Sequence, residues 1–558
     1  MYDTIVVGSG NGACGFLSCY LEANPKAEKI LVIEEGQDFF STSDITHQKS
    51  WSQSYTTEKI YKLHQAFTPE GTPIITGRAC TMGGGGSLNY TMIHESSEWL
   101  AKQMGRTTAY WDELKDKLNQ KFERSDPTKN QSSVTKHVLE KARTANFQLS
   151  SSPSIHNIVN HQEGNADLLH LFTTQFNQFG QRTNSGVSIV NWNDPRLELK
   201  THSKVVELKF AGENKARCVG VKVKNLVTGE TQLFSLADKG RLILCAGAAT
   251  PRLLMAHRER LHNDAIGQQA SDHIAIPLGL YILDRQIDAT QRDNYLPVFA
   301  TTVWHPGTPE ETTCTFDFFA GDLPELLYFF PQLYFPFLVP NWLETIIIKL
   351  PTLFYLVKNL IRELIRLLNL IINLWWSVSN LLKGKSWRHP DLPLITAVLK
   401  FSPARKGYYS DNSPQVKLRF FAEDEAHFSQ DKEVAKYVLK QHLEMINSLG
   451  QQPPRIVRYL LRLTTKIPYR VEDIDRYIDA TSKYFLSTEQ HLSGGCLFGK
   501  AIASGLENTK NTGKVYGSAN VHVADLSAVP LPRVSTQMTA YLVGFHVAKM
   551  LCSNNSQT

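Results

Sequence analysis

Two glycines and one acid near the N-terminus have the spacing needed to hold a dinucleotide. Gly8 and Gly10 belong to the segment TIVVGSGNGACG, and Ala13 takes the third position of a G-x-G-x-x-G/A pattern. Glycines at the first two positions let the chain turn tightly and let a phosphate approach bare backbone. Glu34, about twenty residues further on, suits the hydroxyls of a ribose and would repel a 2′-phosphate. These residues predict a site for an adenine dinucleotide.

The elements that must position these residues follow in the order that such a site requires. Residues 5–7 are a short β-branched run that predicts a buried parallel strand. A helix should begin at Asn11 and Gly12, so that its free N–H groups and its dipole point at the pyrophosphate. Residues 30–33 are a second apolar run, which ends at Glu34. The order strand, turn, helix, strand and acid predicts a βαβ unit around the site.

A second glycine-rich segment, GRACTMGGGGSLN, occupies residues 77–89. Four successive glycines favour neither a helix nor a strand, so this segment should be a loop where backbone meets a ligand. The Thr, Met and Leu residues around the glycines are not the composition of a flexible linker.

The totals exclude several classes of protein. The chain has 558 residues, 42% of them hydrophobic, which is enough for a large core and several domains. A formal net charge of +6 is small for this length and gives no argument for nucleic acid. Eight cysteines without a C-x-x-C pair indicate neither a zinc site nor a disulfide framework, so we expect no metal and a reducing compartment. The first strand begins almost at Met1, and we therefore expect a cytoplasmic protein.

These segments, together with later ones, resemble the motifs of the glucose–methanol–choline (GMC) flavoprotein oxidoreductases. Residues 77–89 are similar to the family's first signature, and the strand and turn at residues 242–248 are similar to its second. Asp272 and His273 match a D-H pair of the family. The motifs keep the family's order along nearly the whole chain. The resemblance implies an FAD-dependent oxidoreductase that acts on a CH–OH group.

The resemblance also implies which residues hold FAD. Leu88 stands where some members carry a histidine joined covalently to the flavin, so the cofactor should be bound without a covalent link. Arg78 should lie near the cofactor phosphates or the flavin edge, with a structural salt bridge as the alternative. The full set of expected cofactor contacts is Gly8, Gly10, Asn11, Gly12, Ala13, Glu34, Arg78, Met82, Gly83, Gly84, Asn89, Val205, Ala246 and Asp525.

The implied fold is α/β, with a Rossmann-type FAD-binding domain assembled from discontinuous pieces and a substrate domain on an antiparallel sheet. We expect an apolar helical insertion within the substrate domain. The FAD-binding domain should comprise residues 1–95, 185–290 and 485–558. The substrate domain should comprise residues 96–184, which include connecting helices, and 291–484.

His491 is the residue expected to take the substrate's proton. Oxidation of an alcohol by a flavin needs a base for the hydroxyl proton while a hydride leaves carbon, and histidine suits this role. The segment HLSGGC resembles the family's H-x-x-G-[TG]-C motif, which selects His491 among 18 histidines. The family's second catalytic position, a His or Asn, falls on Gln537, which can orient a substrate oxygen but cannot accept a proton at neutral pH.

Residues 316–388 have the most unusual composition in the chain. A run of 18 uncharged residues, 326–343, is interrupted by three prolines, which exclude a straight spanning helix. After Pro351 the pattern becomes helical and apolar, with Lys358, Arg362 and Arg366 in one basic stripe and two tryptophans after it. We expect this helix to lie in a membrane interface, on the inner face of a membrane. A helical lid buried in the substrate domain is the alternative.

A membrane contact would favour a lipophilic substrate, such as a long-chain alcohol, a sterol or an isoprenoid. Three other functions stay open from the sequence. They are an NAD-linked dehydrogenase, a flavoprotein or membrane scaffold without catalysis, and a light-driven fatty-acid decarboxylase on the same fold. The electron acceptor does not follow from the sequence.

Overall fold

A computed structural model gives the structure of the protein and describes most of the chain. The described residues are 1–24, 28–37, 60–89, 97–122, 131–149, 167–171, 188–212, 216–283, 298–304, 312–321, ten separate positions between 356 and 382, 394–411, 415–425, 428–452, 468–484, 486–506, 511–533 and 535–553.

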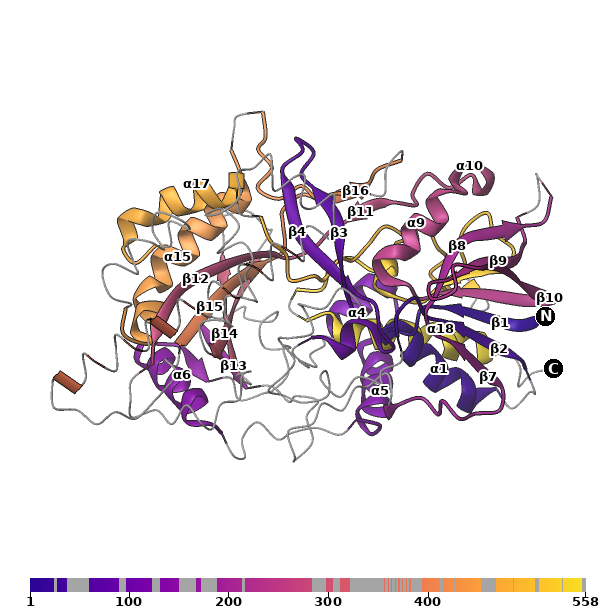
Figure 1. Ribbon diagram of the computed structural model, residues 1–558, viewed down its shortest axis with the longest axis horizontal. Coiled ribbons are helices and arrows are strands. Elements are labelled where there is room, and N and C mark those ends of the chain that lie inside the picture. The colour runs from indigo at the N-terminus through magenta and orange to yellow at the C-terminus, as the bar shows by residue number, and fades with distance from the viewer. Residues whose placement is uncertain are drawn as a thin grey trace.

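A seven-stranded sheet forms the part of the molecule at the right of Figure 1. Its strand order is β7-β2-β1-β10-β9-β8, and β18 pairs with β10 beside that path. The central pairs β2–β1, β1–β10 and β10–β18 are parallel. Its strands are β1 (Tyr2–Val7), β2 (Ile30–Ile33), β7 (Leu197–Lys200), β8 (Ser203–Phe210), β9 (Cys218–Asn225), β10 (Thr231–Leu244) and β18 (Val521–Val523).

This sheet confirms that three distant parts of the chain build one dinucleotide-type domain. β1 and β2 come from the N-terminus, β7 to β10 from the middle and β18 from the C-terminal end. Ile5, Val6 and all four residues of β2 are buried, as their continuous apolar runs require in a sheet covered on both faces.

Helices α1 (Asn11–Ala23) and α18 (Gln537–Cys552) cross below this sheet with almost no space between their backbones. A Cβ added at Gly15 would collide with the Tyr541 carbonyl oxygen, and one added at Gly544 would collide with that of Gly12. Glycine at these positions is therefore a packing requirement. The crossing joins the first helix of the chain to the last.

A six-stranded sheet, mostly antiparallel, lies at the left of Figure 1, in the order β12-β15-β14-β13-β6-β5. Helices α15 (Gln430–Ser448), α17 (Ile474–Tyr484) and α6 (Ser133–Thr144) lie around it. The strands are β12 (Ile274–Ile282), β15 (Leu394–Phe401), β14 (Thr312–Gly321), β13 (Val298–Trp304), β6 (Leu168–Leu171) and β5 (Gln148–Leu149). The expected antiparallel substrate-domain sheet is confirmed.

A smaller sheet lies between the two large ones, in the order β11-β16-β17-β3-β4. Its strands are β11 (Gln268–Ala270), β16 (Gly407–Tyr409), β17 (Val416–Lys417), β3 (Tyr61–Phe67) and β4 (Pro73–Ala79). The remaining elements are α4 (Ser97–Met104), α5 (Thr108–Asn119), α9 (Thr250–Met255), α10 (Arg258–Leu261) and the 3₁₀ turns η1 (Gly84–Ser87), η2 (Gly247–Ala249), η5 (Val471–Asp473) and η7 (Leu526–Ala528).

Val205 lies on the second of two short strands that follow one another in the chain. The chain turns at His202, whose φ is 51° and whose N–H donates to the Gly36 carbonyl at 2.7 Å. β7 therefore ends at Lys200 beside β2, while β8 begins at Ser203 beside β9. The pattern of apolar residues could not show the turn at His202, because apolar residues at strand spacing occur on both sides of it.

Most of the insertion at residues 316–388 lies outside the described residues. Residues 316–321 belong to β14, and the ten described positions from Leu356 to Leu382 are helical, which agrees with the helix predicted after Pro351. In the part of the chain that the structure describes, no helix is long and apolar enough to span a bilayer. The domain boundaries drawn from the sequence stay predictions.

Candidate active site

A cavity of about 540 Å³ extends from the carboxyl ends of β1 and β2 to the loop that carries His491. Its size is within the range of small-molecule and cofactor sites. Eleven of the expected cofactor residues and both expected catalytic residues line it. They are Gly8, Gly10, Asn11, Gly12, Glu34, Arg78, Gly84, Asn89, Val205, Ala246, Asp525, His491 and Gln537.

The middle of the cavity is a glycine cradle at the N-terminus of α1. Gly8 has φ 94°, and a Cβ at Gly84 would lie 2.8 Å from the Gly10 Cα, so the two glycine loops meet backbone to backbone. No side chain caps α1 at Gly10, which leaves its first N–H groups directed at the cavity. A Cβ added at Gly10 would touch only the Gly84 Cα, at 3.7 Å. This cradle fits a pyrophosphate.

Ala13, Met82 and Gly83 do not line the cavity, although the sequence suggested cofactor contact. Ala13 and Met82 are fully buried, the first in the main core and the second against Ile60 and Leu88. Gly83 has φ 84° and donates its N–H to the Ser9 carbonyl at 3.1 Å. In the structure these three residues hold the two glycine loops in place.

Glu34 stands at the end of β2, as predicted for a residue beside a ribose. Its carboxylate accepts hydrogen bonds from the Ser9 N–H (3.0 Å), the Ser9 hydroxyl (2.7 Å) and the Gly36 N–H (2.8 Å). Burial raises the pKa of Glu34, while these hydrogen bonds work to lower it. The bonds orient the carboxylate at the cavity wall, next to Val205.

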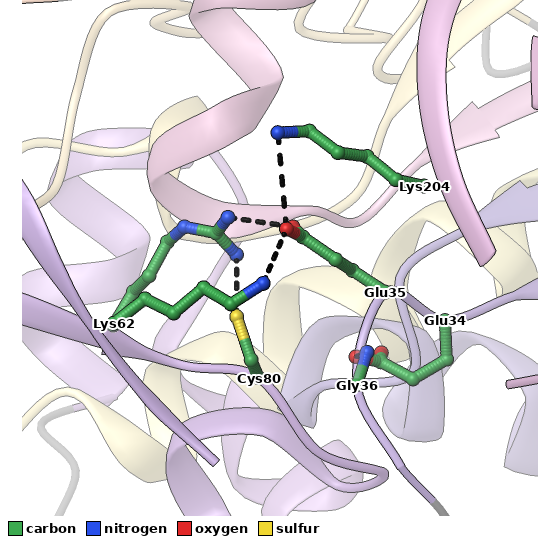
Figure 2. A network of polar contacts seen from close by, with 7 residues as sticks. Glu34, Glu35, Gly36, Lys62, Cys80 and Lys204 are labelled. Carbon is green, nitrogen blue, oxygen red and sulfur yellow. Dashed lines mark hydrogen bonds and ion pairs between the residues drawn. The ribbon is translucent and has the colours of Figure 1, made fainter. Parts of the chain in front are cut away.

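Arg78 forms the salt bridge that the sequence left as the alternative. Its Nη2 lies 2.5 Å from the Glu35 carboxylate, and its Nη1 donates to the Cys80 sulfur at 3.1 Å. Lys62 and Lys204 also reach Glu35, at 3.0 and 3.8 Å, and Figure 2 shows the three cations around one carboxylate. Glu35 follows Glu34 in the chain, and Arg78 lines the cavity together with both acids.

Asp525 follows β18 and shapes the turn that closes the cavity on its opposite side. One carboxylate oxygen accepts from the Gly247 N–H (2.8 Å) and the Thr250 hydroxyl (2.6 Å). The other accepts from the N–H and the hydroxyl of Ser527, at 2.9 and 2.6 Å. Asp525 thereby ties β18 to η2, and Ala246 is held on the cavity wall beside it.

His491 lies at the other end of the cavity and contacts a second histidine. The Nδ1 atoms of His491 and His273 are 3.0 Å apart. The bond has two directions, according to the tautomer of each ring. In the tautomer in which His491 donates its Nδ1–H to His273 Nδ1, the lone pair of His491 is on Nε2.

A buried carboxyl group holds both histidines in this position. Asp272 Oδ1 accepts from the backbone N–H groups of His273 and His491, each at 2.8 Å. Burial raises the pKa of Asp272 to about 8, against the effect of those two bonds. The sequence matched this D-H pair to the family but could not distinguish it from a surface pair; in the structure both residues are fully buried.

Burial disfavours a positive charge on both histidines. Burial, and then the positive charge of Lys400, lowers the pKa of His491 to about 3. Burial also lowers the pKa of His273, and the neighbouring His491 and Lys400 lower it further. A neutral imidazole can accept a proton, so His491 has the protonation state that a base requires.

Gln537 begins α18 and faces the same end of the cavity. Its Oε1 accepts a hydrogen bond of 2.7 Å from the side-chain amide of Asn89. The bond orients the Gln537 amide with its oxygen toward Asn89 and its nitrogen, which only donates, at the other end. With its oxygen engaged by Asn89, the side-chain nitrogen of Gln537 can only donate.

A dinucleotide cradle on a parallel sheet, joined to a neutral histidine and an amide donor, defines a nucleotide-dependent oxidoreductase. Two models of the GMC oxidoreductase family match residues 2–275 and 408–544. The chain therefore belongs to the GMC oxidoreductase family, whose cofactor is FAD.

Solved structures share the fold over almost the whole chain. A formate oxidase matches with 15% identity and a TM-score of 0.67, covering 100% of this chain and 99% of that one. Pyridoxine 4-oxidase from Mesorbium loti matches with 14% identity and a TM-score of 0.62, covering 98% and 99%. A putative truncated GMC-type inactive oxidoreductase of Acanthamoeba polyphaga mimivirus is 36% identical over 78 residues, which are 14% of this chain and 89% of that protein.

The described residues contain no cluster of three or more His, Cys, Asp or Glu that could hold a metal ion. All eight cysteines are buried and free.

Proposed function

We propose that the protein oxidises an alcohol to a carbonyl compound with FAD, and that His491 accepts the hydroxyl proton. The observation that carries this proposal is the contact of 3.0 Å between the Nδ1 atoms of His273 and His491, because a His491 that donates its Nδ1–H there has its lone pair on Nε2. FAD supplies the hydride acceptor when it is bound. Gln537 donates to the substrate oxygen and orients it.

The test is anaerobic mixing of the purified protein with a panel of alcohols, from sugars to sterols. A purified protein that is yellow and bleaches with one class of alcohol supports the proposal. An NAD-linked dehydrogenase would be colourless and would need added NAD. A yellow protein that no alcohol bleaches would instead favour a flavoprotein without this activity, and the mimiviral relative is described as inactive.

We also propose that FAD is bound without a covalent link, because Leu88 has no atom that can form one. Acid precipitation should therefore release the yellow colour into solution. Colour that stays with the precipitate would contradict this proposal.

A membrane contact through residues 316–388 is a further part of the proposal. It is supported by the ten described positions between 356 and 382, which are helical and exposed. One of them is Glu363, and the side chains of the other nine are apolar. They are Leu356, Leu360, Leu367, Leu370, Ile371, Leu374, Val378, Leu381 and Leu382, each between 43 and 82% exposed.

The sequence places Lys358, Arg362 and Arg366 on the other side of this helix, although these residues lie outside the described part. An apolar face with basic residues opposite is the pattern of a helix in a bilayer interface. A lipophilic alcohol that enters from the cytoplasmic side of a bilayer would suit such a contact.

Flotation with anionic liposomes tests the contact. A variant with Leu360, Leu367 and Leu374 changed to Gln should lose flotation, while one lacking residues 325–385 is the deletion control. A wild-type protein that ignores anionic liposomes would remove the membrane proposal and leave the buried-lid alternative.

A further inference from the structure

One arginine on the wall of the cavity has no hydrogen-bond partner. Arg252 lies in α9, the helix that follows the η2 turn, and it lines the cavity. Its Nε and Nη2 atoms are buried, and neither finds a partner in the part of the chain that the structure describes. Its Nη1 atom is not closed off in this way, so a ligand in the cavity can approach the guanidinium there. Charged side chains inside a protein are normally paired.

The charge of Arg252 is also left without a counterion among the described residues. Burial lowers the pKa of Arg252, and the neighbouring charge of Arg78 lowers it further, while Tyr409 acts in the opposite direction. No carboxylate of the described residues acts on this pKa. A guanidinium nevertheless stays protonated at neutral pH. Because a charge inside a protein is costly unless it is paired, this site should attract an anion.

Arg78, the other arginine described on the cavity wall, is already paired. Its Nη2 lies 2.5 Å from the Glu35 carboxylate, which Lys62 and Lys204 also reach. The sequence suggested Arg78 for the cofactor phosphates, but in the structure its charge is compensated by Glu35. Arg252 is therefore the guanidinium whose charge remains available to a ligand.

On one side, the surroundings of Arg252 reach the loop that carries His491. The centre of the Tyr409 ring lies 5.9 Å from the guanidinium carbon of Arg252, and the Tyr409 hydroxyl donates to the Ala248 carbonyl at 3.2 Å. A Cβ added at Gly495 would lie 3.0 Å from the same ring. The loop HLSGGC therefore packs against the tyrosine that also faces Arg252.

On its other side, Arg252 is close to the end of the cavity that holds Glu34. Arg78 acts on the pKa of Arg252, and Arg78 lines the cavity together with Glu34. Arg252 thus lies between the two ends of the cavity, as the glycine cradle does. In a bound dinucleotide the diphosphate occupies this middle position, at the N-terminus of the first helix. The dipole of that helix supplies only about half an elementary charge, which is less than a diphosphate carries.

We propose that Arg252 binds the diphosphate of FAD and supplies the full positive charge that the glycine cradle lacks. A guanidinium suits this role because its planar fork of donors matches two oxygens of a phosphate. The cradle at α1 and the arginine on α9 would then hold the same group. This inference does not depend on the proposed alcohol oxidation, because it concerns only the retention of the cofactor.

The test compares ADP with adenosine as competitors for FAD on the full-length protein, since only ADP contains the diphosphate. Release of FAD is followed by the recovery of its fluorescence. The wild-type protein should prefer ADP to adenosine, and Arg252→Met should lower this preference by about 10- to 150-fold, the range for loss of hydrogen bonds to a charged group. The dissociation constant of FAD should rise by a similar factor, while that of adenosine should stay the same.

Melting temperatures give a second readout that a purely structural arginine would not produce. Arg252→Met should not lower the melting temperature of the protein freed of FAD, because the substitution removes an unpaired charge. FAD should raise the melting temperature of the variant by less than it raises that of the wild type. An arginine needed only for packing would lower the melting temperature both with and without FAD.

Two further variants serve as controls. Arg260 lies on α10, and its Nη1 donates to the Gly212 carbonyl at 2.8 Å. Arg260→Met removes the same charge from a place outside the cavity lining, so it should keep the wild-type preference for ADP. Arg252→Lys keeps a point charge without the fork, and it should recover part of the affinity that Arg252→Met loses.

The outcomes separate this inference from its rivals. An unchanged preference for ADP in Arg252→Met would overturn it, and so would an equal loss of ADP and adenosine, which would place Arg252 at the nucleoside. If the variant keeps FAD but no longer reacts with alcohols that carry a carboxylate, the anion belongs to the substrate and the inference is wrong. If no alcohol reduces the flavin while Arg252→Met still loses FAD, the proposed function fails and this inference stands.

Discussion

Replacement of His273 by leucine should slow substrate oxidation while FAD stays bound. As His491 takes the substrate proton it becomes an imidazolium, and its Nδ1–H bond to His273, 3.0 Å between nitrogens, becomes a bond from a charged donor. Hydrogen bonds to charged groups contribute about 1.5–3 kcal/mol. Since this strength appears only as the charge develops, its loss should slow flavin reduction by about 10- to 150-fold.

The assay is stopped-flow reduction of the bound flavin under anaerobic conditions, with the best alcohol of the panel at saturating concentration. His273→Leu removes the acceptor, whereas His273→Asn retains an oxygen that can accept from His491. We expect the Asn variant to retain most of the rate that the Leu variant loses. The limiting rate should change more than KM, because the bond strengthens in the transition state and not on binding. FAD content per protein is the control for folding.

Two results would refute this reasoning. Equal slowing in the Leu and Asn variants would mean that His273 only fills space. A wild-type rate in the Leu variant, with FAD bound, would mean that another group orients His491.

The pH profile of kcat/KM is a separate test. Burial and Lys400 lower the pKa of His491 to about 3, so the loss of activity on the acid side should fall well below pH 6.5, the ordinary histidine value.

His491→Ala should keep FAD and slow flavin reduction by about 10²–10⁴-fold. Gln537→Ala should slow flavin reduction less, because Gln537 moves no proton. A larger loss in the Gln537 variant would contradict the assignment of His491 as the proton acceptor. Gly10→Val should fold but purify without FAD, since φ is −72° at Gly10 and only the γ-carbons would enter the cavity. By contrast, Gly12→Ala should fail to fold, because its Cβ would collide with the Ala524 carbonyl oxygen, and a soluble yellow protein would disprove this. Burial works to raise the pKa of Glu35, but its three cationic neighbours outweigh it and lower that pKa from 4.5 to about 2. Between pH 4.5 and 2 the folded state therefore binds fewer protons than the unfolded state. The lowered pKa contributes up to about 3 kcal/mol to the free energy of unfolding above pH 4.5, and this contribution is lost as the pH falls toward 2. Urea unfolding should show this loss in the wild type and not in Glu35→Gln.

Local patterns were sufficient to predict the dinucleotide half of the site. The glycines of the first turn, the strand before it and Glu34 are close in sequence, and their roles follow from backbone geometry that glycine alone permits. The structure brings these residues together on the wall of one cavity, and their contacts with the cofactor stay predictions. The same reasoning could not show that Met82 and Ala13 pack inward, since a motif specifies residue types and not which side of a loop faces the ligand.

The catalytic half depends on contacts between residues far apart in the chain. His273 and His491 are 218 positions apart, and their contact is not visible in either local sequence. The Asp317–Lys400 pair joins β14 to β15 across 83 positions of sequence, which include most of the insertion. A buried Lys inside an apolar strand was the available signal, because Lys400 interrupts the run LITAVLKF.

The crossing of α1 and α18 determines when the cofactor site can form during synthesis. The cradle at α1 emerges from the ribosome first, but Gln537 and the helix that packs against Gly12 and Gly15 emerge last. At about 5–20 residues per second, the interval between them is roughly half a minute to two minutes. β10, the partner of β1, is complete at residue 244, whereas β18, the partner of β10, is complete only at residue 523. The cradle at α1 therefore gains its last packing partner only when synthesis of α18 is complete.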